Sequence, residues 1–172
     1  VFHGIAIGRV RFLTKKQNVV TRRKITDTDA EITRYETAKN QAVEQLRALY
    51  GKAVKEVGEV NAQIFEVHAM MLEDGGYNDS VHNLIRSQNV NAEYAVATTG
   101  DNFAEMFANM EDEYFQARSI DIKDVSERVI TILHGGDTGS DIGNEPVIIV
   151  AEDLAPSETV QMDKEKLLAF VT

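Results

Sequence analysis

Apolar residues recur every three or four positions along most of this chain, which is the spacing of one buried face of an α-helix. The pattern extends from about residue 27 to about residue 134, with short connections that favour antiparallel neighbours. The stripes comprise Ile32, Tyr35, Ala38, Ala42, Leu46 and Leu49; Val57, Val60, Ile64, Val67 and Met71; Val81, Leu84 and Ile85; Ala92, Ala95, Val96, Thr99, Phe103, Met106 and Met110; and Ile122, Val125, Val129 and Ile132. Val81, Leu84 and Ile85 mark only a short helix, and the pattern as a whole predicts a four-helix block of two antiparallel hairpins.

Local signals set the expected ends of these helices. Thr28 followed by Glu31 is a capping box, which marks a helix N-terminus. Asn91 is of a residue type that caps a helix in the same way. Gly51 is expected to break or bend the first helix, and residues 75–78 are expected to form a turn.

The period changes to that of extended chain towards both ends. Residues 4–13 alternate apolar with polar or small side chains, which is typical of a half-buried strand. Residues 147–150 are a β-branched run that suits a buried strand, and residues 167–171 begin another. A helical turn is expected at Pro156 and Ser157. The ends of the chain are therefore expected to share one small sheet.

These elements predict a mixed α+β fold in which a helical subdomain is inserted into a small α/β subdomain. The helical subdomain is expected to span residues 25–134, and the α/β subdomain residues 1–24 and 135–172. Val19 and Val20 are candidates to extend the sheet. The basic residues that follow them, Arg22, Arg23 and Lys24, are most simply a solvated turn.

Composition limits what the chain can do. The 172 residues include no Cys, which excludes disulfides and thiolate chemistry and fits a reducing compartment. No stretch approaches the roughly 18–20 apolar residues of a membrane span. A net charge of −10 argues against a nucleic-acid partner, which selects for basic patches. We therefore expect neither a membrane nor a nucleic acid as a partner.

The acidic residues are concentrated in the middle of the chain. Between residues 56 and 117 there are twelve acidic residues and one basic residue, Arg86. Such asymmetry steers a basic partner towards the surface. The stretch from Glu56 to Asp74 also carries Met70 and Met71, adaptable apolar side chains that suit a protein contact. An ordinary amphipathic helix with a solvated acidic face is the alternative explanation of this stretch.

The residues give little support to a catalytic or metal site. The four histidines, His3, His68, His82 and His134, form no pair with ligand spacing. His68 is expected to be a hydrogen-bonded structural residue at a seam between helices rather than a catalytic one. Ser157 and Thr159 have no base and orienting acid at a recognisable spacing.

Four stretches together resemble one family: GIAIGRV at 4–10, IFEVHAMMLED at 64–74, DEYFQARSIDIKDVSERV at 112–129 and VIIVAEDLAPSET at 147–159. The chain is similar to the N-terminal part of enzyme I of the bacterial sugar phosphotransferase system, the phosphoenolpyruvate–protein phosphotransferase. The resemblance implies a helical subdomain that docks the phosphocarrier HPr and an α/β phosphohistidine subdomain. It also implies a cytoplasmic enzyme.

The resemblance further implies what this chain lacks. The family's phosphorylated histidine lies in a GGxxSH-type motif after a strand that corresponds here to Phe170, Val171 and Thr172. The chain is therefore expected to dock HPr without accepting phosphate, and to be inactive alone and monomeric. No cofactor is expected in it, whereas the family's C-terminal domain binds Mg and forms the homodimer.

The docking residues implied by the resemblance come from three separate stretches. Where the family often has an acidic pair, this chain has Gly75 and Gly76, which removes one expected ion-pair contribution. Thr159 matches a threonine that hydrogen-bonds the active histidine in the family. The implied HPr-docking residues are Met70, Met71, Asp74, Phe107, Glu111, Phe115 and Arg118.

Two alternatives stay open at this point. A paralogue, such as a nitrogen-linked enzyme I or the phosphocarrier of dihydroxyacetone kinase, would use the same subdomains. A helical adaptor without any role in phosphotransfer would instead show sustained heptads and oligomerise through its apolar stripes.

Overall fold

The chain forms two compact units, which are described separately below. The computed structural model describes residues 6–13, 18–136, 146–151, 156–162, 165 and 167–171. The α/β unit comprises Val1–Gln17 and Gly139–Thr172, and the helical unit comprises Asn18–Thr138. The unit boundaries therefore fall after residues 17 and 138, whereas the sequence suggested residues 24 and 134.

The α/β unit is a three-stranded parallel sheet with one short helix. Its strands are β1 (Arg9–Leu13), β2 (Val147–Ala151) and β3 (Leu167–Val171), in the order β1-β2-β3, and α6 spans Pro156–Gln161. The predictions of a strand at 147–150, a helical turn at 156 and a strand at 167–171 are confirmed.

A small apolar core holds this sheet together. Val147, Ile149 and Met162 are buried in it, and Leu13 and Leu167 pack against them. The strand predicted for residues 4–13 is shorter, because β1 begins at Arg9. Residues 4 and 5 of that prediction lie outside the described part of the chain.

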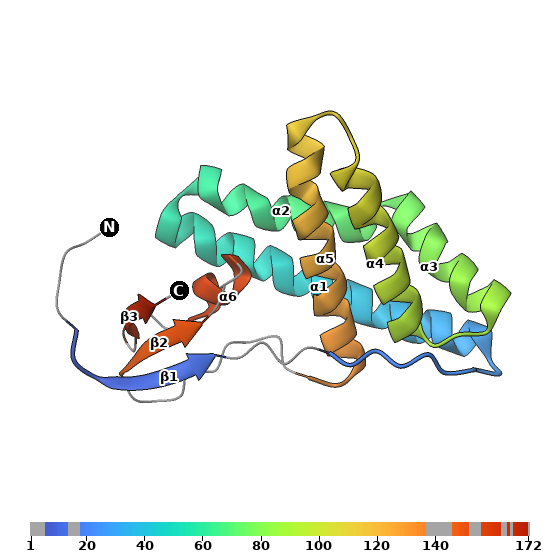
Figure 1. The fold of residues 1–172 in the computed structure, drawn as a ribbon, viewed down its shortest axis with the longest axis horizontal. Helices are drawn as coiled ribbons and strands as arrows, with labels where there is room; N and C mark the ends of the chain where they lie inside the picture. Colours follow the sequence, from blue (N-terminus) through green and yellow to red (C-terminus); the bar gives the residue numbers. More distant parts are fainter. Residues whose placement is uncertain are drawn as a thin grey trace. The chain divides into compact units, whose positions relative to one another are not determined.

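The helical unit is almost continuous helix from residue 28 to residue 133, as predicted (Figure 1). Helices α1 with α2 and α4 with α5 form two closely packed hairpins, and α3 packs against α4. Both hairpins contact each other through α1 and α5. The helices are α1 (Thr28–Val57), α2 (Glu59–Glu73), α3 (Gly75–Gln88), α4 (Ala92–Ala108) and α5 (Glu113–Leu133).

The start and end of α1 differ from the prediction. Asp27, not Thr28, is the N-cap, and its side chain accepts a hydrogen bond of 3.0 Å from the backbone N–H of Ala30. The helix also runs through Gly51 without interruption and ends at Gly58, whose φ of 86° lies in the region that favours glycine. The predicted capping box and the predicted break at Gly51 are therefore wrong.

The residues predicted as a turn at 75–78 instead begin α3. Asp74 caps this helix by accepting a hydrogen bond of 2.9 Å from the backbone N–H of Tyr77. Glycines at the first two helical positions carry no side chain that would oppose this cap. A single aspartate thus ends α2 and starts α3.

Residues 18–27 belong to the helical unit and do not extend the sheet. Arg22, Arg23 and Lys24 are exposed to solvent, as predicted, but they do not form a turn. Ile25 donates a backbone hydrogen bond of 2.9 Å to Asn89, and Asn91 donates one of 3.1 Å to Arg23. The Asn91 side chain does not cap α4, because it accepts a hydrogen bond of 2.8 Å from the backbone N–H of Arg23. We refer to residues 18–27 as the strap.

The buried face of α2 is one position away from the predicted stripe. Ala62, Phe65, His68, Ala69 and Leu72 are buried. By contrast, the predicted Val57 and Val60 are exposed, Val60 by 81%, and Ile64, Val67 and Met71 are half-buried. The predicted stripe of α4 also fails at its end, since Met106 is exposed. The helices were therefore predicted correctly, whereas the buried face of α2 and the end of the buried stripe of α4 were predicted wrongly.

A glycine in α4 sets how closely α4 and α5 approach. A methyl group on Gly100 would lie 2.5 Å from Ser126 Oγ, which is hydrogen-bonded to the Tyr77 hydroxyl at 2.7 Å. We expect Gly100→Ala to lower the free energy of unfolding by about 1–3 kcal/mol. Gly51→Ala is the control: its methyl group would meet nothing within 4 Å, so the change should raise stability by about 0.5–1 kcal/mol. Urea unfolding of both variants tests this, and equal effects would contradict it.

Candidate protein-docking site

Five aromatic rings form a continuous series across three helices of the helical unit. Tyr77 and Phe103 have ring centroids 5.6 Å apart, and Phe103 and Phe107 are 6.2 Å apart. Phe107 and Phe115 are stacked at 6.2 Å, and Phe115 contacts Tyr114 at 5.6 Å. We call these five residues the aromatic row. It leads from the fully buried Tyr77 to Phe115 and Tyr114, which are exposed by 41% and 57%.

The turn between α4 and α5 brings the row together. Phe107 lies in the last turn of α4, and the backbone N–H of Met110 donates a hydrogen bond of 3.2 Å to its carbonyl. Asp112 caps α5 by accepting a hydrogen bond of 2.8 Å from the N–H of Tyr114. The Gln116 side chain donates a further bond of 2.7 Å to the carbonyl of Met110. These local bonds place Phe115 against Phe107.

Arg118 continues the row as its charged end. Its guanidinium carbon lies 5.1 Å from the centroid of the Tyr114 ring, which is cation–π geometry. Its Nη1 is 3.0 Å from Asp121 Oδ2. The other carboxylate oxygen of Asp121 is 3.1 Å from Nε2 of His68, whose side chain is 1% exposed. His68 is buried between helices, as the prediction of a structural residue at a helix seam requires, but the predicted hydrogen bond is wrong, because neither ring nitrogen has a hydrogen-bond partner among the described residues.

Burial shapes the inner end of the row. Burial raises the pKa of Tyr77 to about 12, although its hydrogen bond with Ser126 acts in the opposite direction. The Tyr77 hydroxyl therefore stays neutral at physiological pH. This end of the row is structural, and the ability to contact another molecule lies at the outer end.

The two methionines differ in exposure on α2. Met70 is 64% exposed, whereas Met71 is half-buried. The exposed Val60 and the half-buried Ile64 and Val67 lie on the same helix and extend its apolar surface. The stripe that the sequence assigned to the core is thus available for contact.

Asp74 lies near the aromatic row, and Glu111 is exposed in the turn that precedes α5. A methyl group on Gly76 would lie 3.2 Å from Asp74 Oδ1 and 3.9 Å from Phe103 Cζ. The junction of α2 and α3 is therefore close to the row. Glu111 is solvent-exposed.

Of the seven predicted docking residues, the contacts join Phe107, Phe115 and Arg118. Phe103, Tyr114 and Asp121 also belong to this series of contacts, although they were not among the predicted site residues. Their spacing offered a signal: Phe103 precedes Phe107 by four residues, Tyr114 precedes Arg118 by four, and Arg118 precedes Asp121 by three. Residues so spaced on a helix face each other.

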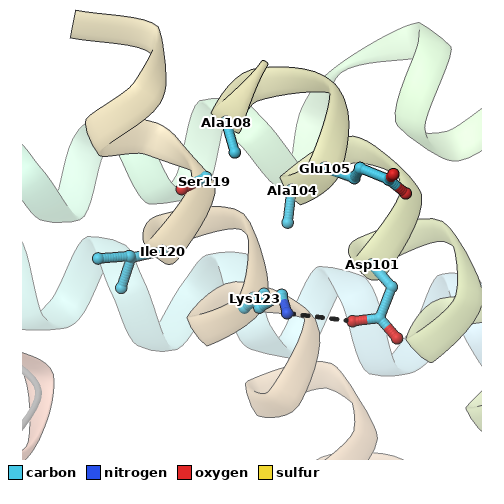
Figure 2. Close-up of a pocket in the computed structure, with 7 residues that line it drawn as sticks. All are labelled: Asp101, Ala104, Glu105, Ala108, Ser119, Ile120 and Lys123. Carbon is cyan, nitrogen blue, oxygen red and sulfur yellow. Dashed lines mark ion pairs between the residues drawn. The ribbon is translucent and has the colours of Figure 1, made fainter. Parts of the chain in front are cut away.

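A groove lies between α4 and α5 (Figure 2). Ala104 and Ala108 of α4 face Ser119 and Lys123 of α5 across it, and Lys123 Nζ is 3.5 Å from Asp101 Oδ1. Glu105 and the exposed Ile120 complete its lining. Within the described ranges, no three His, Asp or Glu side chains converge in a way that could hold a metal ion.

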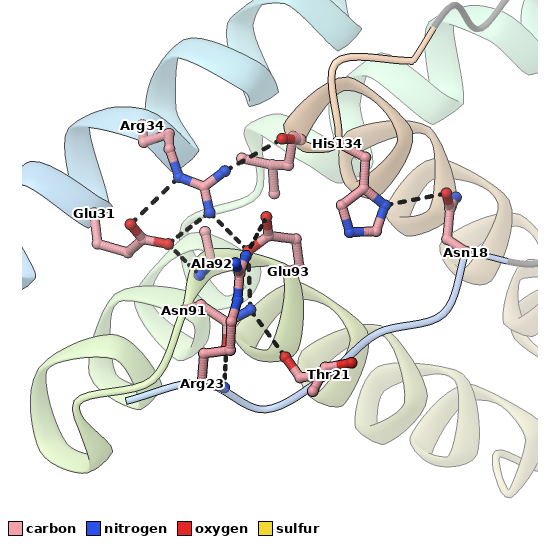
Figure 3. A network of polar contacts seen from close by, with 10 residues as sticks. Asn18, Thr21, Arg23, Glu31, Arg34, Asn91, Ala92, Glu93 and His134 are labelled. Carbon is pink, nitrogen blue, oxygen red and sulfur yellow. Dashed lines mark hydrogen bonds and ion pairs between the residues drawn. The ribbon is translucent and has the colours of Figure 1, made fainter. Parts of the chain in front are cut away.

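A charged network surrounds the strap (Figure 3). The Arg34 guanidinium donates hydrogen bonds of 2.7 Å to Glu31 and to Glu93 and one of 3.3 Å to the carbonyl of Leu133. The Glu93 side chain is 2% exposed and also accepts a bond of 3.0 Å from Asn91. This network joins the strap to three helix ends, which indicates a structural role.

Thr159 lies in α6 of the α/β unit and is half-buried. Phe170 and Val171 are the last residues of β3, and Thr172 lies outside the described residues. None of the helices described here is long and apolar enough to cross a bilayer.

The comparisons with known proteins agree with the resemblance in the sequence. A family model described as PEP-utilising enzyme, N-terminal, matches residues 1–118. The NMR solution structure of Enzyme I (nEIt) matches with a TM-score of 0.84 and 34% identity, covering 97% of this chain and 68% of that chain. The chain therefore belongs to the family of PEP-utilising enzymes and corresponds to their N-terminal part.

Curated relatives narrow the family further. Proteins named phosphoenolpyruvate-protein phosphotransferase match from Mycoplasma capricolum (37% identity over 171 residues), Bacillus subtilis (37% over 170) and Haemophilus influenzae (39% over 173). Each match covers 98% of this chain but only 30% of the relative. The chain thus spans about 30% of the length of these relatives.

A second solved structure, titled N-terminal domain of Enzyme 1 - Nitrogen, shares the fold. It has a TM-score of 0.74 at 22% identity and covers 97% of this chain and 69% of that chain. At this identity the likeness concerns the fold alone.

Proposed function

We propose that this chain is the HPr-docking part of a phosphoenolpyruvate–protein phosphotransferase. In the whole enzyme, a histidine would take phosphate from phosphoenolpyruvate and pass it to a histidine of the carrier HPr for sugar uptake in the cytoplasm. Family membership supports this assignment. We call the proposed contact region the docking surface; it comprises Met70, Met71, Asp74, Phe107, Glu111, Tyr114, Phe115 and Arg118.

One observation carries the docking proposal. Phe107, Phe115 and Arg118, which the resemblance selects from two separate helices, lie in one uninterrupted series of contacts through Tyr114. Phe115 and Tyr114 are exposed although they are large and aromatic. Clustered aromatic and arginine side chains dominate the energetics of protein interfaces.

The remaining residues suit a partner that is apolar at its centre and basic at its rim. Met70 and the apolar side chains along α2 can adapt to an opposing surface. Asp74 and Glu111 are exposed, so each contributes about 1 kcal/mol or less to affinity and acts mainly on the association rate. The alternative explanation for Asp74 and Glu111 is that they belong to an ordinary solvated helix face.

The phosphate-accepting histidine is proposed to lie in the part of the enzyme outside this chain. Within the described residues, His68 is buried against Asp121, and His82 Nε2 lies 2.8 Å from Glu36 Oε1. His134 Nδ1 lies 3.3 Å from Asn18 Oδ1, and His3 is outside the described residues. Such engaged side chains are poorly placed as nucleophiles.

Three further features are part of the same proposal. Thr159 of α6 would hydrogen-bond the active histidine in the whole enzyme. Mg and the homodimer contact would belong to the C-terminal domain, and this chain would be a monomer.

The nitrogen-linked paralogue is the second candidate, because its N-terminal domain has the same fold.

An NMR titration of isotope-labelled HPr with this chain, at low and at moderate salt, tests the docking function. We expect shifts confined to the face of HPr that carries its active histidine, and weaker binding as salt rises because surface charges are screened. A folded circular dichroism spectrum of this chain, together with an HPr spectrum that does not change at high protein excess, would overturn the proposal.

A further inference from the structure

Asp121 connects the docking surface to the buried seam between α2 and α5. Its Oδ1 lies 3.1 Å from His68 Nε2 and its Oδ2 lies 3.0 Å from Arg118 Nη1. The carboxylate is only 16% exposed, and the two groups that it joins are 1% and 20% exposed. One partly buried acid thus serves a core residue and a surface residue at once.

Arg118 depends on this carboxylate for its position. Its guanidinium carbon lies over the Tyr114 ring, 5.1 Å from the centroid, and its Nη1 forms an ion pair with Asp121. Arg118 Nε, Asp121 Oδ2 and both ring nitrogens of His68 are buried and make no hydrogen bond within the described part of the protein, so Asp121 meets Arg118 and His68 in close polar contacts without hydrogen-bond geometry. Without Asp121, only the exposed Tyr114 would orient the guanidinium.

Arg118 is one of few basic residues in this acidic part of the sequence. From residue 56 to residue 118 the sequence contains only Arg86 and Arg118 as basic residues. The planar guanidinium donates to an oxygen acceptor in a fixed geometry, which a mobile side chain would do less well. Arg118 can therefore bind a carbonyl or carboxylate oxygen of an otherwise basic partner.

We propose that Asp121 is a positioning residue of the docking surface: anchored by His68, it holds Arg118 over Tyr114 so that Arg118 can bind an oxygen acceptor on the carrier protein. This inference rests on the proposed docking function. His68 acts here only through Asp121, as the fixed point on α2. Asp124, whose Oδ2 is 3.9 Å from His68 Nδ1, is the second acid beside that histidine.

The test compares Asp121→Asn with Asp101→Asn in the same hairpin. Asp101 is 73% exposed and pairs with Lys123 at 3.5 Å, so its replacement removes the same charge without touching Arg118. Two quantities are measured: the affinity for labelled HPr, and the NMR signal of the Arg118 Nε–H group in the free chain. The free-chain signal reports positioning even without a partner.

We expect Asp121→Asn to shift the Arg118 signal, to speed its exchange with water, and to weaken HPr binding about tenfold. Asp101→Asn should leave the signal in place and change affinity less than twofold. Asp121→Glu, which keeps the charge, should recover most of the affinity. If Asp121→Asn does not fold, Asp121→Glu is compared with the wild type and Asp101→Asn in its place.

The outcomes separate this inference from the docking proposal. An Arg118 signal that stays in place in Asp121→Asn overturns the positioning role. If the Arg118 signal shifts in Asp121→Asn but the affinity for HPr falls no more than in Asp101→Asn, Asp121 is not important for docking. A folded wild-type chain that does not bind HPr overturns the proposed function itself.

Discussion

Replacement of Phe107 by alanine is expected to weaken binding of HPr about 30-fold, which corresponds to about 2 kcal/mol for an aromatic residue at the centre of an interface. Phe107 lies between Phe103 and Phe115, and its loss would remove both ring contacts. Because the side chain is only half-buried in the free chain, we expect the fold to lose about 1 kcal/mol. The larger effect should therefore appear on binding.

Isothermal titration calorimetry with HPr measures this effect, and thermal unfolding measures the cost to the fold. Phe12→Ala is the matched control, because it removes an aromatic ring that is 72% exposed in β1, outside the docking surface. The affinity of the Phe12→Ala variant for HPr should equal that of the wild type. Equal losses for both variants, or no loss for Phe107→Ala, would refute the assignment of Phe107.

Arg34→Met is expected to lower the free energy of unfolding by about 3–5 kcal/mol at neutral pH, because it leaves a buried charge uncompensated. The Glu93 carboxylate, 2% exposed, would lose its bond of 2.7 Å to Arg34. Among the described residues it would keep a backbone hydrogen bond, the bond from Asn91 and the more distant Arg23, at 3.4 Å. The carbonyl of Leu133 would also lose a donor.

Urea unfolding at neutral pH measures this loss. Arg86→Met is the control, since Arg86 is 60% exposed and its nearest acid, Asp29, is 4.0 Å away. We expect it to cost less than about 1 kcal/mol. The network would be unimportant for folding if both variants unfolded at the same urea concentration.

The same network predicts how stability depends on pH. Burial raises the pKa of Glu93, but the hydrogen bonds from Arg34 and Asn91 and the charge of Arg34 outweigh it, so the pKa is lowered overall. A lowered pKa stabilises the fold above the unfolded value of about 4.3, and this contribution is lost as the pH falls through the folded value. The stability difference between wild type and Arg34→Met should therefore narrow as the pH falls through the lowered pKa of Glu93 and its carboxylate becomes protonated.

The helices and strands were largely predictable because each depends on a local period. The face of α2 was not, since that helix carries two apolar stripes one residue apart, one through Ile64 and Val67 and one through Phe65 and Leu72. Only the surfaces against which α2 packs decide between them. Phe65 and Leu72 are buried in the core, whereas Ile64 and Val67 are only half-buried.

The residues of the candidate site also fall into those that the sequence could predict and those that it could not. Phe107, Phe115 and Arg118 could be selected by the family resemblance. The role of Asp121 could not, because its contact with His68 joins residues 53 positions apart on different helices. Neither helix period nor spacing reveals such a contact.

The strap has a consequence for how the helical unit can be carried by a longer chain. Asn18 donates hydrogen bonds to Glu127 and Thr131 of α5, and His134 lies beside it. The chain therefore enters and leaves this unit at neighbouring points. An insertion whose two ends meet does not force the flanking strands apart, so β1 and β2 can pair directly although more than 130 residues separate them. The helical unit can therefore change in sequence or length without changing how the strands of the sheet pair.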